Sequence, residues 1–87
     1  MFDYIFINVI KILKKKIPSL TDEKITCESA LKEDIGINSI LFYDLLIDLE
    51  NEFQIIFKDF SMNSLKYKTI GDLCNTIKDL IGEREND

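Results

Sequence analysis

The feature that most constrains the fold of this chain is the helical spacing of its apolar residues. In three segments, residues 2–17, 39–53 and 69–81, apolar side chains recur every three or four positions. That period places them on one face of an amphipathic helix. One proline and three glycines among 87 residues leave few breaks for long elements, so the sequence predicts an all-α domain. The stripes are Phe2, Ile5, Phe6, Val9, Ile10, Leu13 and Ile17; Phe42, Leu45, Leu46, Leu49 and Phe53; and Ile70, Leu73, Ile77, Leu80 and Ile81.

The residues between these stripes set the ends of the helices. Pro18 ends the first helix at about residue 16, because the residue before a proline is pushed out of the α region. Thr69 is a good N-cap for the last helix, and Gly82 is predicted to stop it. Residues 54–60 could be mistaken for a short strand. No second strand exists to pair with them, so we interpret them as a connection with buried anchors.

The predicted architecture is a four-helix bundle with three main helices, one short third helix and a long first loop. The short helix falls at residues 61–67, and the loop covers residues 18–38. A loop of that length is unusual in a small domain unless it is functional. We assign residues 1–82 to a single domain and expect residues 83–87 to fray. The apolar residues expected to anchor the loop are Leu20, Ile25, Leu31 and Ile35.

Composition excludes several classes of function. The net charge of −5 argues against nucleic acid as a partner, because phosphate binding needs a basic face. The only basic cluster, residues 14–16, complements the dipole at the C-terminus of the first helix. Without histidine the chain has no Ser-His-Asp or Cys-His arrangement, and a zinc site would lack its usual ligands. We expect no catalysis by the chain itself and no metal.

Cysteine usage and hydropathy indicate where the protein works. Cys27 and Cys74 lie far apart in sequence and form no C-x-x-C motif. Nothing demands an oxidising compartment, so the cytoplasm is the expected location. The apolar residues 4–13 are interrupted by Asn8 and Lys11, and no segment is long enough to span a membrane. We expect a monomer without a membrane span.

Ser39 opens the second helix and allows two interpretations. Serine is a preferred N-cap, and Gly36 supplies a turn before it. The residue three positions on is Phe42, however, and not the glutamate or glutamine of a capping box. Asn38 is also a competent cap, which would leave Ser39 as the first helical residue with a free hydroxyl. A hydroxyl there faces the positive end of the helix dipole and free N–H groups, which suit an attached phosphate.

The sequence DIGINSI, residues 34–40, resembles the modification motif of acyl and peptidyl carrier proteins, D-x-G-x-[DN]-S-[LI]. As in that family, an amphipathic helix follows and ends in an E-x-E-F-like sequence, here ENEF at residues 50–53. ITCESALKEDIG at residues 25–36 resembles the family's approach to the site. YKTIGDLCNTI at residues 67–77 is similar to the opening of its last helix. Together these matches cover most of the chain in the family's order and spacing.

The resemblance implies a carrier protein that is not itself an enzyme. Ser39 would receive 4′-phosphopantetheine from coenzyme A through a separate phosphopantetheinyl transferase. Asp34, Gly36 and Asn38 would shape the modification loop. The thiol of the arm would then hold an acyl or aminoacyl group as a thioester. The implied partners are a loading enzyme, either an acyltransferase or an adenylating ligase, and synthase or condensing enzymes.

The second helix carries the expected partner-binding face. Residues 38–57 include four acidic residues and no basic one, which favours steering of basic partner surfaces; the alternative is an ordinary solvated face. Asp44 and Asp48 are the acidic residues assigned to partner binding. Leu41 and Ile47 join them as either scattered surface apolarity or a hydrophobic docking spot.

Two departures from the family pattern bear on the pathway. Asn38 stands where fatty-acid carriers usually have aspartate, and Leu41 replaces a residue that is often acidic. If Leu41 and Ile47 form a docking spot, the client enzymes resemble those of polyketide or peptide assembly. The preferred reading is therefore a discrete carrier of a specialised pathway, and the alternative is the general carrier of fatty-acid synthesis. A rival of another class is an unmodified helical protein-interaction domain in which Ser39 is only a cap.

Overall fold

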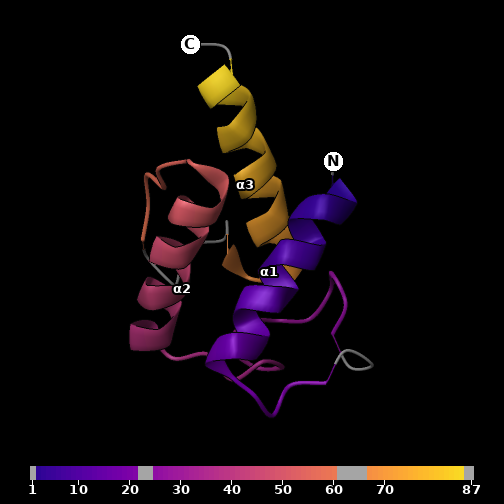
Figure 1. Ribbon diagram of the computed structural model, residues 1–87. Coiled ribbons are helices and arrows are strands. Elements are labelled where there is room, and N and C mark those ends of the chain that lie inside the picture. The colour runs from indigo at the N-terminus through magenta and orange to yellow at the C-terminus, as the bar shows by residue number, and fades with distance from the viewer. Residues whose placement is uncertain (1, 22–24, 61–66, 86–87) are drawn as a thin grey trace.

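The computed structural model describes residues 2–21, 25–60 and 67–85. Its helices are α1 (Phe2–Lys16), α2 (Ser39–Phe53) and α3 (Ile70–Glu85). α1 packs against both other helices, and the long first loop runs below them before entering α2 (Figure 1). The described ranges contain no strand, only an isolated bridge between Ala30 and Thr69. The predicted all-α class, three main helices and long first loop are confirmed.

The predicted stripe of α2 forms the centre of the core. All five of its apolar residues are buried, and the largest exposed fraction among them is 4%, at Phe53. The stripe of α1 from Ile5 onward and the stripe of α3 pack against it in one continuous cluster. Burial of these side chains is the main stabilising contribution in a domain of this size. Leu20 is partly buried, as expected of an anchor, and the other buried loop anchors are Ile25, Leu31, Ile35 and Ile37.

The connection after α2 is irregular, as predicted for residues 54–60. Gln54 adopts a left-handed conformation with φ of 55°, and its N–H donates to the carbonyl of Glu50, which ends α2. The Glu50 carboxylate also accepts the N–H of Phe57 at 2.8 Å. Ile55 and Phe57 are buried, so the connection is held to the core by the anchors that the sequence predicts.

The start of α3 confirms the predicted N-cap. The Thr69 hydroxyl accepts the N–H of Asp72, and the Asp72 carboxylate accepts the N–H of Thr69, each at 3.1 Å. This reciprocal pair is a capping box with aspartate in place of the usual glutamate. The predicted short helix at residues 61–67 lies outside the described residues except for Tyr67.

The prediction that Gly82 stops the last helix is wrong, because α3 continues to Glu85. The last turn is held by contacts with the last residue of α2 and with the chain that follows it. Arg84 donates to the carbonyl oxygen of Phe53, and Glu83 forms an ion pair of 3.1 Å with Lys58. Residues 83–85 are therefore helical, and residues 86–87 lie outside the described part of the chain.

Candidate functional site

The loop before Ser39 is a tight turn stapled by Asp34. The Asp34 carboxylate accepts the N–H of Ala30 at 2.8 Å, while the N–H groups of Asp34 and Ile35 donate to the Ala30 carbonyl. Gly36 follows with φ of +83°, a conformation that residues with a Cβ rarely adopt. Asp34 and Gly36 thus occupy the two positions that turn the chain toward α2.

The same loop is fastened to the start of α3 by backbone hydrogen bonds. The Leu31 N–H donates to the carbonyl of Lys68, and the Ile70 N–H donates to the carbonyl of Ser29, both at 3.0 Å. One residue further on, the Gly71 N–H donates to the carbonyl of Cys27 at 2.8 Å. These bonds to the start of α3 fix the loop that presents Ser39.

Asn38, and not Ser39, caps α2. The Asn38 backbone is extended, with φ of −100° and ψ of 176°, and its side-chain oxygen accepts the N–H of Leu41 at 2.8 Å. Ser39 is the first helical residue and is exposed, and its hydroxyl makes no hydrogen bond within the described part of the chain. Of the two interpretations that the sequence allows, the structure has the one that leaves the Ser39 hydroxyl free.

Asp44 and Asp48 form ion pairs within the chain. Lys16, the last residue of α1, places its ammonium group 2.5 Å from Asp44 and 2.7 Å from Asp48. Burial disfavours the charged form of Lys16, but the hydrogen bonds to the two carboxylates outweigh it and hold its pKa above the ordinary 10.5. The sequence analysis missed this pairing because it sought basic residues only within residues 38–57.

The apolar residues exposed beside Ser39 differ from those predicted. Leu41 is only partly exposed and packs against the core, and Ile47 is 39% exposed. Ile40 and Tyr43, which the sequence analysis did not assign, are 84% and 53% exposed. Ile40, Tyr43 and Ile47 recur at intervals of three and four residues opposite the buried stripe, and this spacing could have revealed them. We call these three residues the exposed apolar stripe.

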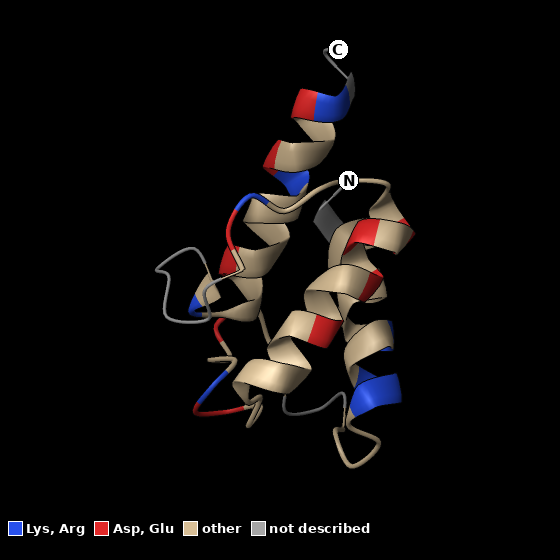
Figure 2. Cartoon of the chain, turned by 90° about the vertical axis from the view of Figure 1, so that its left-hand side faces the viewer, with Lys and Arg blue, Asp and Glu red and all other residues tan. Residues whose placement is uncertain are grey.

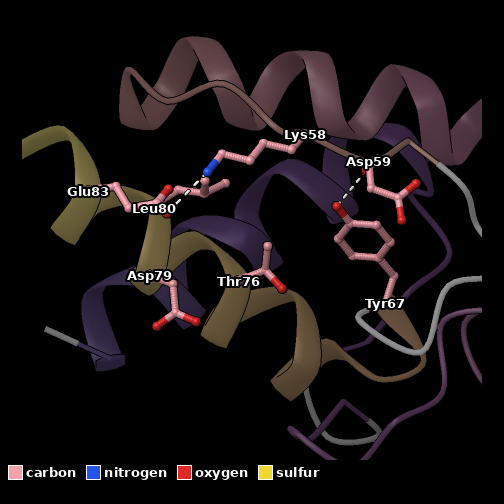
Figure 3. Close-up of a pocket in the computed structure, with 7 residues that line it drawn as sticks. All are labelled: Lys58, Asp59, Tyr67, Thr76, Asp79, Leu80 and Glu83. Carbon is pink, nitrogen blue, oxygen red and sulfur yellow. Dashed lines mark hydrogen bonds and ion pairs between the residues drawn. The ribbon is translucent and has the colours of Figure 1, made fainter.

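A hollow of about 240 Å³ lies elsewhere, between α3 and the connection after α2 (Figure 3). The Tyr67 hydroxyl points across it and donates to the carbonyl oxygen of Asp59. Lys58 and Glu83 form their ion pair at its rim. Neither Ser39 nor the loop before it lines this hollow, so it is separate from the candidate site.

Other kinds of site find no support in the described residues. No group of three His, Cys, Asp or Glu side chains there could hold a metal ion, and no helix there has the length and hydropathy to cross a bilayer. Cys27 and Cys74 are both free thiols. Burial raises the pKa of Cys74 to about 12, with a smaller contribution from Cys27, so Cys74 is not an activated nucleophile.

A helical domain that presents an exposed serine hydroxyl at the start of a helix, in a chain without histidine, is suited to carrying a group. Comparison with known proteins supports this class. Residues 9–77 match the family model described as phosphopantetheine attachment site, and the chain belongs to this family. It is therefore a carrier with covalently attached 4′-phosphopantetheine and not a catalyst.

Two curated relatives show how far the similarity extends. The chain is 30% identical to an acyl carrier protein of Exiguobacterium sibiricum over 76 residues, covering 87% of this chain and 92% of that protein. It is 31% identical to an acyl carrier protein of Thermotoga maritima over 78 residues, covering 90% of this chain and 93% of that protein. The similarity to each thus spans nearly the whole of both chains.

The first turn of α2 fits the phosphate of the arm. The Asn38 side chain satisfies the Leu41 N–H, and the Asn38 carbonyl accepts the Phe42 N–H. The N–H groups of Ser39 and Ile40 have no partner within the described residues. These free donors, together with the positive end of the helix dipole, favour an anion on the Ser39 oxygen.

Proposed function

We propose that Ser39 is the attachment residue, with Asp34, Gly36 and Asn38 as the residues that shape its loop. The observation that carries this proposal is the free, exposed Ser39 hydroxyl, which exists because Asn38 takes the capping position. In the attachment step a bond forms between the Ser39 oxygen and the phosphorus of the arm. The pyrophosphate bond of coenzyme A breaks, and 3′,5′-ADP leaves. The arm supplies a terminal thiol that holds cargo as a thioester.

The cargo is an acyl or aminoacyl group, carried by a discrete cytoplasmic domain that extends to the end of α3 at Glu85. The name of both relatives, acyl carrier protein, supports an acyl group. Asn38 and the uncharged surface beside Ser39 favour a specialised pathway of polyketide or peptide type over general fatty-acid synthesis. The partners are a phosphopantetheinyl transferase, a loading acyltransferase or adenylating ligase, and synthase or condensing enzymes.

Intact mass spectrometry tests the attachment residue. Incubation with coenzyme A and a broad-specificity phosphopantetheinyl transferase should add one arm to the wild-type chain and none to Ser39→Ala. Ser19→Ala is the matched control, because Ser19 is an exposed serine in the turn after α1, and this variant should still gain the arm. If the wild-type mass does not change, or if Ser39→Ala gains the arm, the assignment to Ser39 is wrong.

Loading assays separate the pathways. The modified chain is offered to a malonyl transferase with malonyl-coenzyme A, and to adenylating ligases with amino acids or carboxylic acids and ATP. The proposed specialised pathway predicts efficient loading by a ligase or a dedicated acyltransferase. Efficient malonyl loading followed by chain elongation with fatty-acid synthesis enzymes would show that the chain is the general carrier.

A further inference from the structure

A groove of about 390 Å³ lies between α1 and the first loop, and neither Ser39 nor the residues that shape its turn line it. Its floor is apolar, since Ile10 of α1 and Ile25 of the loop are only 9% and 8% exposed. Ile7 stands at its rim and is 53% exposed. Small-molecule sites have this range of volume and a mainly apolar lining with few polar groups. We call the groove lined by the following residues the α1 groove: Phe6, Ile7, Ile10, Lys11, Lys14 and Ile25.

The lining residues of α1 form two rows along the helix. Phe6, Ile10 and Lys14 follow one another at intervals of four residues. Ile7 and Lys11 form the neighbouring row with the same interval. Side chains four residues apart lie on the same face of a helix, so each row begins apolar and ends at a lysine. The α1 groove therefore has an apolar end and a basic end, about 12 Å apart at a rise of 1.5 Å per residue.

The basic end belongs to a basic helix in an acidic chain. α1 carries four of the chain's 11 basic residues and one of its 16 acidic residues. Figure 2 shows the basic last turn of α1 beside α2, whose charged residues are all acidic. Among the described residues that line the α1 groove, none is acidic. A ligand in this groove therefore meets lysine as the charged side chain of the lining.

Lys11 is the lysine available to a ligand at the basic end. It is exposed, and it forms no ion pair with the described residues. Lys14 is half-buried and already interacts within the chain. Lys16 is held by the two carboxylates of α2, and Lys15 lines a neighbouring hollow but not this groove.

We propose that the α1 groove binds a soluble, single-chain anionic amphiphile, with the alkyl chain against Phe6 and Ile7 and the carboxylate at Lys11. The chain removes the exposed part of Ile7 from water, which is the main favourable contribution. The carboxylate pairs with Lys11 and fixes the direction in which the ligand lies. The length of the groove suits a chain of medium length. The site does not involve Ser39 or the arm, so the proposal does not depend on the proposed function.

Backbone amide NMR spectra of the full chain, recorded during ligand titrations, test the proposal. Decanoate is the probe, at about pH 8, where its carboxylate is ionised. Decyl maltoside offers the same alkyl chain with an uncharged head, and acetate offers the carboxylate without a chain. Each amphiphile is kept below the concentration at which it forms micelles.

Two pairs of variants separate the groove from the rest of the surface. Ile7→Ser is compared with Ile56→Ser, because Ile56 is 77% exposed but lies in the connection after α2. Lys11→Gln is compared with Lys15→Gln, because Lys15 is an exposed lysine of the same helix outside the groove. Circular dichroism verifies that all four variants are folded.

Decanoate should shift the amide signals of residues 6–14 and of Ile25, with a Kd on the order of 1 mM. Decyl maltoside should cause smaller shifts at the same concentration, and acetate none. Ile7→Ser should weaken decanoate binding about tenfold and Ile56→Ser by less than about twofold. Lys11→Gln should weaken it about threefold, as expected for an exposed ion pair, and Lys15→Gln should leave it nearly unchanged.

Several outcomes would overturn the proposal. Shifts confined to the buried faces of α2 and α3 would mean that the ligand enters the bundle instead. Equal effects within either pair of variants would remove the groove from the contact. Binding to phosphatidylglycerol vesicles without any response to decanoate would make the groove a bilayer contact. The same shifts on raising the protein concentration alone would mean that a second copy fills it.

The titration is repeated with Ser39→Ala, which should bind decanoate as the wild-type chain does. This result separates the proposal from the proposed function, because Ser39→Ala cannot receive an arm through that residue. Loss of decanoate binding in Ser39→Ala would show that the ligand site includes Ser39 and would contradict the assignment to the α1 groove.

Discussion

The backbone N–H of Gly71, in the first turn of α3, donates a 2.8 Å hydrogen bond to the carbonyl oxygen of Cys27 in the first loop. With the bonds at Leu31 and Ile70, it fastens the loop before Ser39 to a helix that is more than thirty residues away in sequence. The position of the Ser39 hydroxyl therefore depends on α3.

Gly71→Ala should destabilise the protein. A Cβ at position 71 would lie 2.9 Å from the Cys27 carbonyl oxygen, so the loop must shift. We expect a loss of roughly 1–3 kcal/mol in the free energy of unfolding, measured by urea denaturation. Gly82→Ala is the matched control, because no atom lies within 4 Å of the added Cβ in the same helix. It should gain roughly 0.5–1 kcal/mol, and equal effects at the two positions would contradict the close approach.

Asn38 should matter for the stability of the fold, whereas Ser39 should matter for modification and little for stability. Asn38→Ala removes the side-chain oxygen that accepts the Leu41 N–H, which should cost about 1 kcal/mol in the free energy of unfolding. Asn38→Asp keeps a capping oxygen and should keep most of that stability. Ser39→Ala should change stability by less than about 0.5 kcal/mol, since the hydroxyl makes no hydrogen bond within the described residues. A larger cost for Ser39→Ala than for Asn38→Ala would mean that Ser39 is the cap.

Stability should fall at alkaline pH. Burial raises the pKa of Cys74 from 9.0 to about 12 and that of Tyr67 from 10.0 to about 12. Below about pH 8 both groups keep nearly all of their protons in the folded and unfolded chains, so they add almost no pH dependence there. Above it the unfolded chain releases these protons first, and the free energy of unfolding decreases as the pH rises toward about 12.

Urea denaturation between about pH 8 and about pH 10 isolates the contribution of Cys74, because the thiol ionises before the phenol in the unfolded chain. Cys74→Ala should lose most of the decline in that window, while Lys16 and Tyr67 still cause a decline at higher pH. Cys27→Ala serves as the comparison and should keep the decline. If Cys74→Ala and wild type decline in parallel, the buried thiol is not the cause.

Local patterns in the sequence predicted the helices because helical period is a property of neighbouring residues. The α2 stripe is buried at every position that the spacing indicated. The sequence left two candidates for the N-cap of α2, since Asn38 and Ser39 are both residues that cap helices. Only the backbone angles of Asn38 decide between them. The pairing of Lys16 with Asp44 and Asp48 joins residues about thirty positions apart, and no local pattern encodes it.

At the end of α3 the local rule that a glycine follows the last helical residue failed. Glycine often follows a helix end, but Gly82 has no positive φ here, and tertiary contacts extend the helix past it. Arg84→Ala should therefore cost roughly 1 kcal/mol in the free energy of unfolding, because it removes a charged donor from the Phe53 carbonyl. Glu83→Gln breaks only an ion pair between exposed side chains and should cost less than about 0.5 kcal/mol. Helix content measured by circular dichroism should fall for Arg84→Ala and not for Glu83→Gln. Unchanged stability in Arg84→Ala would mean that the helix extends past Gly82 without help from the end of α2.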